Sequence, residues 1–335
     1  MNTSISPFPS ELQIGNPTMY DNLAIVPLLN TNNSHPDYFT LDEGLDASLF
    51  EVEELDGGAR VNDILFRNQS DKFALLFEGE EFLGAKQNRI LNVSIFVTPK
   101  TKQTIPVSCV EAGRWRHQHQ SRSKQRFRAA NRMHYARGRA FENQAVSASL
   151  ASCHEYRSDQ SGVWKDISLK SNRMKVHSDS SASAAMYVSA ESKIEVYLKS
   201  FKHTPNQVGS VFLIDGTVSG LELFATEATH RKMIQKLIRS YALDAIDSSM
   251  TSSKSAEEST RKLSNKQCLE ATEEFTNKLQ SSWTKRFDGV CVGENYRFKD
   301  DYLTGSALVH EDRLLHLCAF ALDPELSATE ADAIH

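Results

Sequence analysis

Five short apolar segments follow one another between residues 22 and 111, and they restrict the folds open to this chain more than any other feature. Their sequences are NLAIVPLL, DILFRN, FALLFEG, RILNVSIFVTP and TIPVSCVEA, and Gly, Asn, Asp or Pro separates them. Apolar runs bounded by such turn formers are typical of β-strands. FALLFEG is apolar on both faces, whereas RILNVSIFVTP places on one face Leu91, Val93, Ile95 and Val97. The pattern predicts an antiparallel sandwich or barrel that has one solvated surface and at least one central strand.

The second half of the chain mixes helix and strand patterns. The clearest helix is EATHRKMIQKLIRSYALDAI, whose apolar stripe consists of Ile234, Leu237, Ile238, Tyr241 and Ala245. QVGSVFLIDGTVSGLELF and GSALVHEDRLLHLCAF each predict two strands, joined by DGT and EDR turns. KIEVYLKSF fits either a helix or a strand. We therefore expect an α+β fold, in which an N-terminal antiparallel β-rich sandwich or barrel-like domain precedes a mixed α/β C-terminal part.

An abrupt change of composition after Trp115 marks the expected domain boundary. Nine Lys or Arg residues lie between residues 114 and 139, and no Pro or Gly interrupts residues 121–137, which predicts a long helix. The expected divisions are a flexible N-terminus (1–19), a β-rich domain (20–115), a basic helical connection (116–152), a mixed α/β part (153–322) with an exposed Ser-rich loop (247–266), and a tail (323–335).

Composition and charge exclude several classes of protein. The 335 residues are 40% hydrophobic and carry a net charge of -5. Neither a wholly disordered protein nor a dedicated nucleic-acid-binding protein is therefore expected. The five cysteines are widely spaced and form no CxxC pair, which favours reduced thiols over disulfides or a zinc site. Because no apolar span and no secretory leader pattern is present, we expect a cytoplasmic protein that does not associate with membranes.

The segment EGEEFLGAKQNRIL, residues 78–91, gathers polar side chains between two apolar runs. Its acids and donors are Glu78, Glu80, Glu81, Lys86, Gln87, Asn88 and Arg89. At one end of a sheet they would form a pocket for a hydroxylated or phosphorylated ligand, with Glu80 or Glu81 as a general acid or base. The alternative is a solvated hairpin whose charges pair across the turn and stabilise it by only ~0.2–1 kcal/mol.

The strand that ends in PVSCVEAGRW adds a second polar group. Cys109 follows two apolar neighbours on its strand face, so a buried thiol is expected rather than a nucleophile, which would need a nearby base. Glu111, Arg114 and Trp115 come next, and a carboxylate, a guanidinium and an indole at a strand exit can hold a ring or a ribose. An arginine stacked on a tryptophan at a domain edge explains the same residues without a ligand.

The Arg-rich segment supports a further hypothesis. Its basic side chains are interleaved with Trp115, Phe127 and Tyr135, a combination that suits single-stranded nucleic acid. The acidic balance of the chain and the lack of a recognisable nucleic-acid module favour instead a solvated helix that pairs with acidic surface. His117 and His119 have no third ligand at a defined spacing, so no metal site is expected.

The stretch EGEEFLGAKQNRILNVSIFVTPKTKQTIPVSCVEAGRW resembles the ARG and rhodanese-phosphatase-superfamily-associated protein domain. The resemblance extends upstream over YDNLAIVPLL and DYFTLDEGL, and downstream over SDQSGVWKDI, QVGSVFLIDGTVSGLELF, LIRSYALDA and LTGSALVHEDRLLHLCAF. It therefore covers residues from about 20 to about 320. GAKQNR and PVSCVE.GRW are its most specific phrases, while residues 116–139 and 247–266 depart from the family pattern.

The name of this family records an association with ADP-ribosylglycohydrolases (ARG) and with rhodanese-phosphatase proteins. The resemblance therefore implies a context, the processing of ADP-ribose or a related NAD-derived compound, but it carries over no established reaction and leaves any cofactor unknown. The polar positions within the family phrases are Glu80, Glu81, Lys86, Gln87, Asn88, Arg89, Glu111, Arg114, Trp115, Asp159 and Gln160. They include cations for a pyrophosphate, carboxylates and amides for ribose hydroxyls, and a flat partner for adenine. Two alternatives stay open. One is a noncatalytic interaction or scaffold protein that works beside ADP-ribose-processing enzymes, and the other is nucleic-acid binding through the Arg-rich segment.

Overall fold

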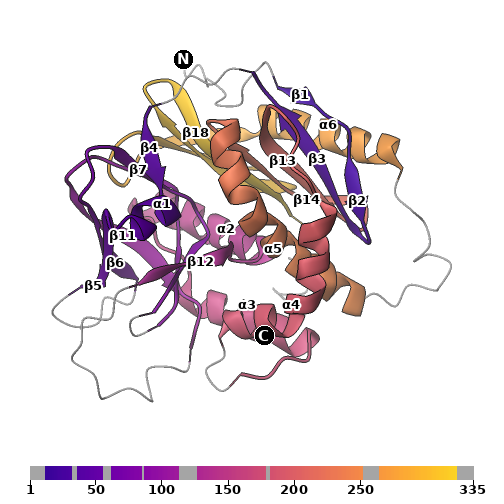
Figure 1. Cartoon of the computed structure of the whole chain (residues 1–335), viewed down its shortest axis with the longest axis horizontal. Helices are drawn as coiled ribbons and strands as arrows, with labels where there is room; N and C mark the ends of the chain where they lie inside the picture. The colour runs from indigo at the N-terminus through magenta and orange to yellow at the C-terminus, as the bar shows by residue number, and fades with distance from the viewer. Residues whose placement is uncertain are drawn as a thin grey trace.

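The computed structural model describes residues 12–31, 36–55, 62–84, 87–112, 127–178, 182–251 and 264–322, apart from the side chain of Trp283. Figure 1 shows a large sheet, a smaller β unit and several helices packed against both. The fold is α+β with a β-rich N-terminal region, which confirms the expected fold class.

The large sheet unites strands from the two ends of the chain. Its strands are β1 (Gln13–Ile14), β2 (Thr18–Tyr20), β3 (Leu23–Leu29), β13 (Gln207–Ile214), β14 (Thr217–Phe224), β15 (Trp283–Asp288), β16 (Glu294–Lys299), β17 (Leu303–His310) and β18 (Arg313–Ala321). Their order is β1-β3-β13-β14-β18-β17-β16-β15, and β2 also pairs with β3. Strand β3 runs antiparallel to β13 over its whole length. The N-terminal strands therefore belong to the same sheet as the C-terminal hairpins.

The smaller β unit contains two further sheets and one short helix, α1 (Leu41–Asp46). One sheet has the order β10-β7-β4, formed by β4 (Tyr38–Thr40), β7 (Phe73–Leu76) and β10 (Ile95–Val97). The other has the order β12-β8-β9-β11-β6-β5 and consists of β5 (Phe50–Glu54), β6 (Asp63–Asn68), β8 (Glu80–Leu83), β9 (Arg89–Leu91), β11 (Lys102–Cys109) and β12 (Arg128–Met133). Apolar side chains from both sheets fill a common core.

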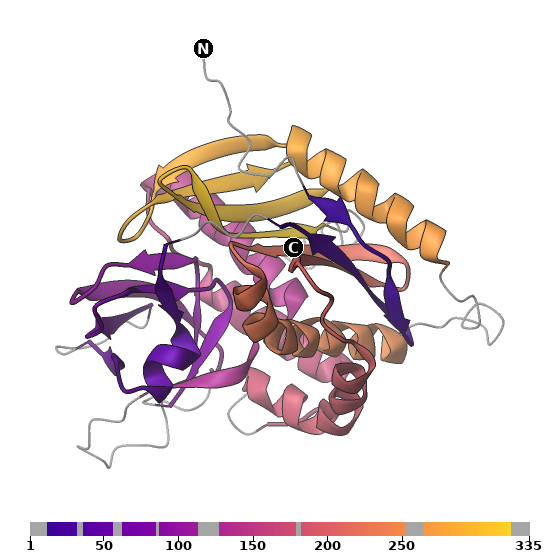
Figure 2. The same cartoon turned by 45° about the horizontal axis from the view of Figure 1, so that its top comes forward.

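Longer helices cover both faces of the large sheet. They are α2 (Ala136–Cys153), α3 (Gln160–Arg173), α4 (Ser183–Ser200), α5 (Glu227–Thr251) and α6 (Asn265–Ser281). Alternation along β13 explains the layering, since Phe212 stacks on Tyr241 of α5 whereas Leu213 shares a core with Phe275 of α6. Figure 2 shows α5 and α6 on opposite sides of the sheet.

Several expected elements are confirmed. Strands β13 and β14 are joined at Asp215 and Gly216, and β17 and β18 at Glu311 and Asp312, so both hairpins lie where the sequence predicts them. All four turn residues have positive φ, as two-residue hairpin turns require. The helix predicted from EATHRKMIQKLIRSYALDAI forms as α5, and KIEVYLKSF is helical within α4.

Other expectations differ from the structure. The helix expected over residues 121–137 is wrong at Arg128–Met133, which form β12, while residues 113–126 lie outside the described part. Of the N-terminal segment expected to be flexible (1–19), residues 1–11 lie outside the described part, and β1 and β2 in the remainder pair with β3. The Ser-rich stretch 247–266 begins inside α5 and ends inside α6, and its residues 252–263 are not described. The run after Leu91 is interrupted between β9 and β10 and is buried on both faces, because the large sheet covers the face expected to be solvated.

Arg139 of α2 lies where the large sheet, the helices and the β unit meet. Its Nη1 is 2.5 Å from Oε1 of Glu222 on β14, and its Nε donates to the carbonyl of His134. Its guanidinium also lies over the rings of Tyr241 and Phe320. The side chain of Arg139 is 1% exposed, so water does not solvate its charge, and Glu222 supplies the compensating charge instead.

Gly79 of the β unit packs directly against the side chain of Arg139. It has a φ of +87°, and a Cβ there would collide with the side chain of Arg139, which Glu222 holds in place. Gly79→Ala should therefore destabilise the protein by ~3 kcal/mol or more, because backbone strain and a steric clash add. The free energy of unfolding in urea is the measurement. Gly216→Ala is the matched control, since Gly216 has a φ of +88° in a hairpin turn; equal losses in the two variants would contradict the predicted clash.

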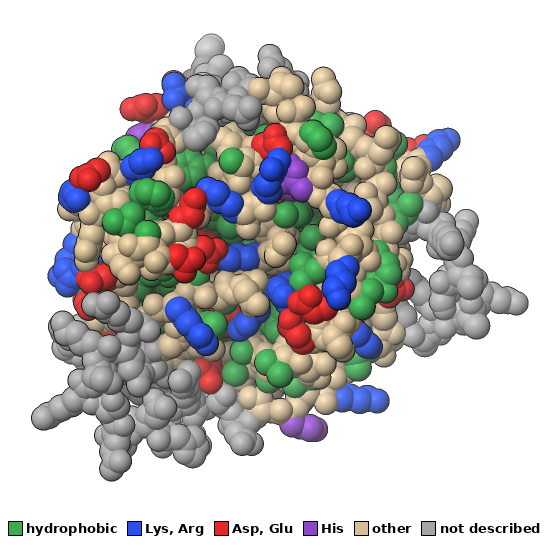
Figure 3. Space-filling view, in the orientation of Figure 1, with side chains coloured by type: hydrophobic (Ala, Val, Ile, Leu, Met, Phe, Trp, Pro, Cys, Tyr) green, Lys and Arg blue, Asp and Glu red, His purple; other side chains and the backbone are tan. Residues whose placement is uncertain are grey.

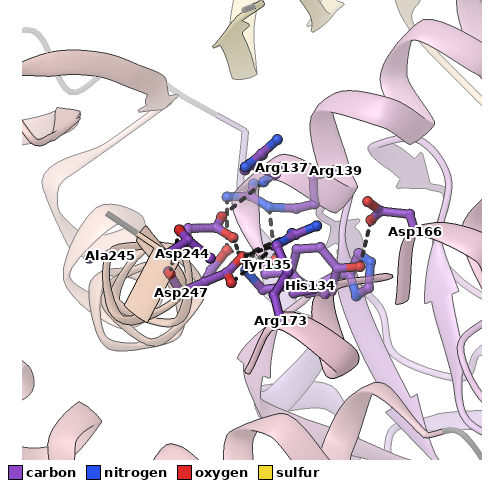
Figure 4. A network of polar contacts seen from close by, with 12 residues as sticks. His134, Tyr135, Arg137, Arg139, Asp166, Arg173, Asp244, Ala245 and Asp247 are labelled. Carbon is purple, nitrogen blue, oxygen red and sulfur yellow. Dashed lines mark hydrogen bonds and ion pairs between the residues drawn. The ribbon is translucent and has the colours of Figure 1, made fainter. Parts of the chain in front are cut away.

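A second buried network joins α2, α3 and α5. Figure 4 shows Asp244 and Asp247 of α5 facing Arg137 and Arg173. Lys170 of α3 donates to both aspartates, at 2.6 Å and 2.9 Å. Asp244 also accepts from the backbone N–H of Arg137 in the first turn of α2. The carboxylates thus fix the start of one helix and the side of another.

The charge on Asp247 makes stability depend on pH. Burial by itself would raise the pKa of Asp247, but Lys170 and Arg173 outweigh it and lower that pKa below its ordinary value. The stability that this carboxylate contributes is therefore present above the unfolded-state pKa of about 4 and is lost as the pH falls through the folded-state pKa.

Asp247→Asn should remove this contribution. We expect a loss on the order of 2 kcal/mol at neutral pH, because Lys170 keeps Asp244 as a partner, and a flatter decline of stability towards acid pH. Urea unfolding as a function of pH measures both. Glu274→Gln is the control, since Glu274 pairs with Lys278 on the exposed face of α6 and its loss should change neither quantity measurably. An Asp247→Asn protein with the acid profile of the wild type would rule out the assignment.

Candidate functional site

The two predicted catalytic glutamates lie on opposite faces of β8. Glu80 points towards α5, where its Oε1 accepts a hydrogen bond from Nζ of Lys236 at 3.0 Å. Lys236 in turn pairs with Asp42 of α1 at 2.6 Å. Burial raises the pKa of Glu80, and the charge of Lys236 opposes that rise. Because side chains alternate along a strand, Glu80 and Glu81 point in opposite directions. Glu80 lies between α1 and α5, where it contributes to their packing.

Glu81 faces the other side and pairs with Arg132 of β12. Nη2 of Arg132 donates to Oε1 at 2.9 Å, and its Nε lies 2.8 Å from Oε2. The guanidinium also lies over the ring of Tyr187 on α4 at 4.9 Å. Burial raises the pKa of Glu81 although Arg132 acts against it, and the negative field of Glu111 adds to the rise. Glu81 therefore holds a proton to higher pH than an ordinary glutamate.

The loop after β8 and the end of β11 meet beside Glu81. The amide Nε2 of Gln87 donates to the carbonyl of Glu111 at 3.0 Å, and the backbone N–H of Asn88 donates to the Glu111 carboxylate at 3.4 Å. Glu111 also forms an isolated backbone bridge with Ala182, directly before α4. The structure thus brings together predicted residues from two separate family phrases.

Arg89 is the buried cation of this region. Its Nη1 donates to Oε1 of Gln87 at 3.2 Å, and its Nη2 lies 3.5 Å from Oε2 of Glu54 at the end of β5. Its Nε has no hydrogen-bond partner among the described residues, and the same holds for Oε1 of Glu54 and Oγ of Ser183. Unmatched buried polar atoms on three side chains indicate room for a polar ligand or water. We refer to Glu81, Gln87, Arg89, Glu111 and Arg132 as the Arg89 cluster. Gln87 links Arg89 to Glu111, whereas the Glu81–Arg132 pair lies on the other face of the β8–β9 ladder, because Glu81 is paired with Ile90 and Arg89 with Phe82.

Cys109 lies next to the cluster but is held as a structural thiol. Its Sγ is 2.8 Å from Oε1 of Gln87, and its backbone N–H and carbonyl both pair with the side-chain amide of Gln160. Burial raises the pKa of the Cys109 thiol. Gln160 therefore satisfies the backbone hydrogen bonds at the end of β11. Asp159 caps α3, since its carboxylate accepts from the backbone N–H groups of Ser161 and Gly162.

Three predicted residues, Lys86, Arg114 and Trp115, lie outside the described residues. Sequence reasoning also missed members of the region, namely Arg132, Glu54 and Ser183. Arg132 was read as part of a solvated basic helix, and the signal that would have found it is the strand alternation of RAANRM, in which Ala130 and Arg132 share a buried face. Glu54 and Ser183 carry no local pattern that links them to residues 78–91.

The surrounding surface carries charges of both signs. Figure 3 shows acidic and basic side chains interspersed over the face that Figure 1 presents, with no large basic patch among the described side chains on that face. Arg132 and Arg139, from the segment considered for nucleic-acid binding, are buried in ion pairs with glutamates. These two arginines are unavailable to a phosphate backbone.

The fold and the Arg89 cluster define an α+β protein whose β unit buries polar side chains of β8, β9, β11 and β12. The chain belongs to the family of ARG and Rhodanese-Phosphatase-superfamily-associated Protein domains, whose family model matches residues 11–320. No curated protein and no solved structure matches the chain. In the described ranges, no three His, Cys, Asp or Glu side chains are arranged to hold a metal ion. None of the helices built from those residues is long and apolar enough to span a membrane.

Cysteine reactivity tests whether Cys109 is structural. Cys153 is exposed at the end of α2, and hydrogen bonds from Ser149 and Ser152 lower its pKa, whereas Cys109 is buried. Iodoacetamide at about pH 8 should therefore modify Cys153 rapidly and Cys109 only after unfolding. Peptide mass spectrometry after timed quenching measures both rates, and Cys153→Ser identifies the fast phase. Modification of Cys109 in the folded protein at the rate of Cys153 would instead make Cys109 a candidate nucleophile.

Proposed function

We propose that the Arg89 cluster binds ADP-ribose or a related NAD-derived compound. The observation that carries the proposal is the link from Arg89 through Gln87 to Glu111, beside unmatched atoms of Arg89, Glu54 and Ser183, with the Glu81–Arg132 pair close enough to Glu111 to feel its charge. A guanidinium matches the paired oxygens of a pyrophosphate, and carboxylates accept hydrogen bonds from ribose hydroxyls. Membership of a family named for its association with ARG proteins gives the compound class its context.

The start of α4 strengthens the match to a phosphate-containing ligand. Among the described residues no side chain caps this helix or bonds to the buried hydroxyl of its first residue, Ser183. The N-terminus of a helix favours negative charge, because its first N–H groups lack intrahelical acceptors. Arg89 reaches the same region through Gln87 and Glu111, which contacts Ala182. Lys86, Arg114 and Trp115 stay predicted contributors to this site.

Glu81 is the residue best placed for acid or base catalysis in this proposal. Its raised pKa allows it to hold a proton that it can exchange with a water or a ribose hydroxyl. Arg132 fixes the carboxylate with two nitrogens, so its orientation is defined before a ligand arrives. Glu80 is engaged with Lys236 on the other face of the strand, which supports Glu81 over Glu80.

Calorimetric titration with ADP-ribose and NAD tests the proposal. The wild type should bind at least one of them with a Kd below the millimolar range. Arg89→Gln should weaken binding by about tenfold or more, since hydrogen bonds to a charged group are worth ~1.5–3 kcal/mol. Arg67→Gln is the control, because Arg67 forms an exposed pair with Glu53 in the same β unit. The proposal fails if the wild type shows no binding at millimolar ligand or if both variants lose affinity equally, with folding verified by thermal unfolding.

A noncatalytic role beside ADP-ribose-processing enzymes is the alternative that the same variants address. It predicts that Glu81→Gln and Arg89→Gln proteins retain a co-purified partner and that no nucleotide binds. The five cysteines are all free, which suits a reducing compartment and supports a cytoplasmic location for either role.

A further inference from the structure

Arg297 is a buried cation that lies away from the Arg89 cluster. It projects from β16 towards the β unit and is 2% exposed. None of its three guanidinium nitrogens has a hydrogen-bond partner within the described part of the chain. The nearest carboxylate, Glu78, has its Oε2 3.9 Å from Nη1. That separation is too long for a hydrogen bond, so the donors of a buried guanidinium are left unmatched.

Glu78 is committed to other partners. Its Oε1 accepts from Asn143 of α2 and its Oε2 from Ser306 of β17, each at 2.7 Å. Ser306 is the cross-strand partner of Arg297, so both side chains lie on the face of the large sheet that meets α2 and the β unit. Arg297 therefore points into a layer where three parts of the fold meet, without donating a hydrogen bond to any described residue there.

Two neighbouring residues have unmatched atoms in the same layer. Asn295 precedes Arg297 by two positions on β16, shares its sheet face, and is buried with both Nδ2 and Oδ1 unmatched. Glu142 of α2 is buried beside Glu78 and Ser108, and its Oε1 is unmatched. We call Arg297, Asn295 and Glu142 the Arg297 site; Glu78 links its two sides, since it lies 3.9 Å from Arg297 and close enough to Glu142 to raise the pKa of Glu142.

The chemistry of the unmatched atoms defines the occupant. They are four nitrogens, three on Arg297 and one on Asn295, against two oxygens, one on Asn295 and one on Glu142. Burial raises the pKa of Glu142 well above its ordinary value, and the charge of Glu78 adds to this, which favours the protonated carboxyl. Donors outnumber acceptors. Water donates as often as it accepts, whereas an oxyanion only accepts and so fits this set better.

Tyr156, in the connection between α2 and α3, covers the site. The centroid of its ring lies 5.9 Å from the guanidinium carbon of Arg297. Its hydroxyl donates to the carbonyl of Asp288, and its own carbonyl accepts from Asn92 of the β unit. The connection is thus fastened at two points, and an ion beneath it would exchange slowly with solvent.

We infer that Arg297, Asn295 and Glu142 form an internal binding site for a small oxyanion, a free ion that carries a phosphate or a carboxylate group. The ion accepts hydrogen bonds from the guanidinium of Arg297 and from the amide Nδ2 of Asn295. It links β16 of the large sheet to α2. This site is separate from the proposed nucleotide site, since it shares no residue with the Arg89 cluster.

Thermal unfolding of the full chain tests the inference. Wild type and Arg297→Met proteins are compared in sodium phosphate, sodium acetate and sodium chloride at equal ionic strength. Phosphate, acetate or both should raise the Tm of the wild type in a saturable manner, by on the order of 5 °C at a hundredfold excess over Kd. The Arg297→Met protein measures the general salt effect and should show no saturable rise. The salt that acts identifies a phosphate or a carboxylate as the ligand group.

A second measurement covers an ion so tightly bound that added salt has no effect. Ion chromatography of the anions released by acid denaturation should then find about one phosphate or small carboxylate per wild-type chain, and none from Arg297→Met. Should the mutant fail to fold, Asn295→Leu replaces it in both assays. Equal salt responses in wild type and mutant, together with no released anion, would overturn the inference. Titration with ADP-ribose should be unchanged in Arg297→Met, which separates this site from the proposed nucleotide site.

Discussion

The ion pair between Arg139 and Glu222 is the interaction on which the arrangement of the layers depends. Arg139 belongs to α2, Glu222 to the centre of the large sheet, and the arginine passes against Gly79 in the turn before β8. Removing one partner would leave an uncompensated charge in the interior, which costs far more than the pair itself contributes. Every layer must therefore be in position for the charge to be matched. The pair can therefore form only when the β unit packs on the sheet in one particular arrangement.

In the same buried layer, the side chains of a serine, a histidine and a glutamate contact one another in a row. Oγ of Ser94 is 2.7 Å from Nδ1 of His316, whose Nε2 is 3.4 Å from Oε2 of Glu222. These residue types also form the triads of hydrolases. Here Ser94 is 3% exposed and its hydroxyl already accepts from the backbone N–H of Glu78, so it has no access to a substrate. The chain of hydrogen bonds links the β unit to the sheet and extends the influence of the Arg139 pair.

Much of the fold could be predicted because local pattern and turn chemistry agree with it. The two C-terminal hairpins and α5 follow from alternation, turn residues and one apolar stripe. Strand β12 was missed because its arginines suggest a solvated helix; the alternation of Ala130 and Arg132 indicates a strand, but the burial of Arg132 depends on neutralisation by the distant Glu81. In the candidate site, too, some residues could be predicted from local sequence and others could not. Residues within one phrase, such as Gln87 and Arg89, are adjacent in sequence and in space, whereas Glu54, Arg132 and Ser183 join them only through tertiary packing.

The position of β3 has a consequence for how the protein is made. Its central partner, β13, begins almost two hundred residues later in the chain, at Gln207. At a synthesis rate of roughly 5–20 residues per second, β3 leaves the ribosome about 10–40 s before that partner exists. The apolar residues of LAIVPLL lack their partner strand for this interval, and the hydrogen-bonding edge that later pairs with β13 stays open. A nascent chain with such a strand suits a chaperone that binds extended apolar segments. A circular permutant that starts shortly before β13 would shorten the time between the synthesis of the two strands.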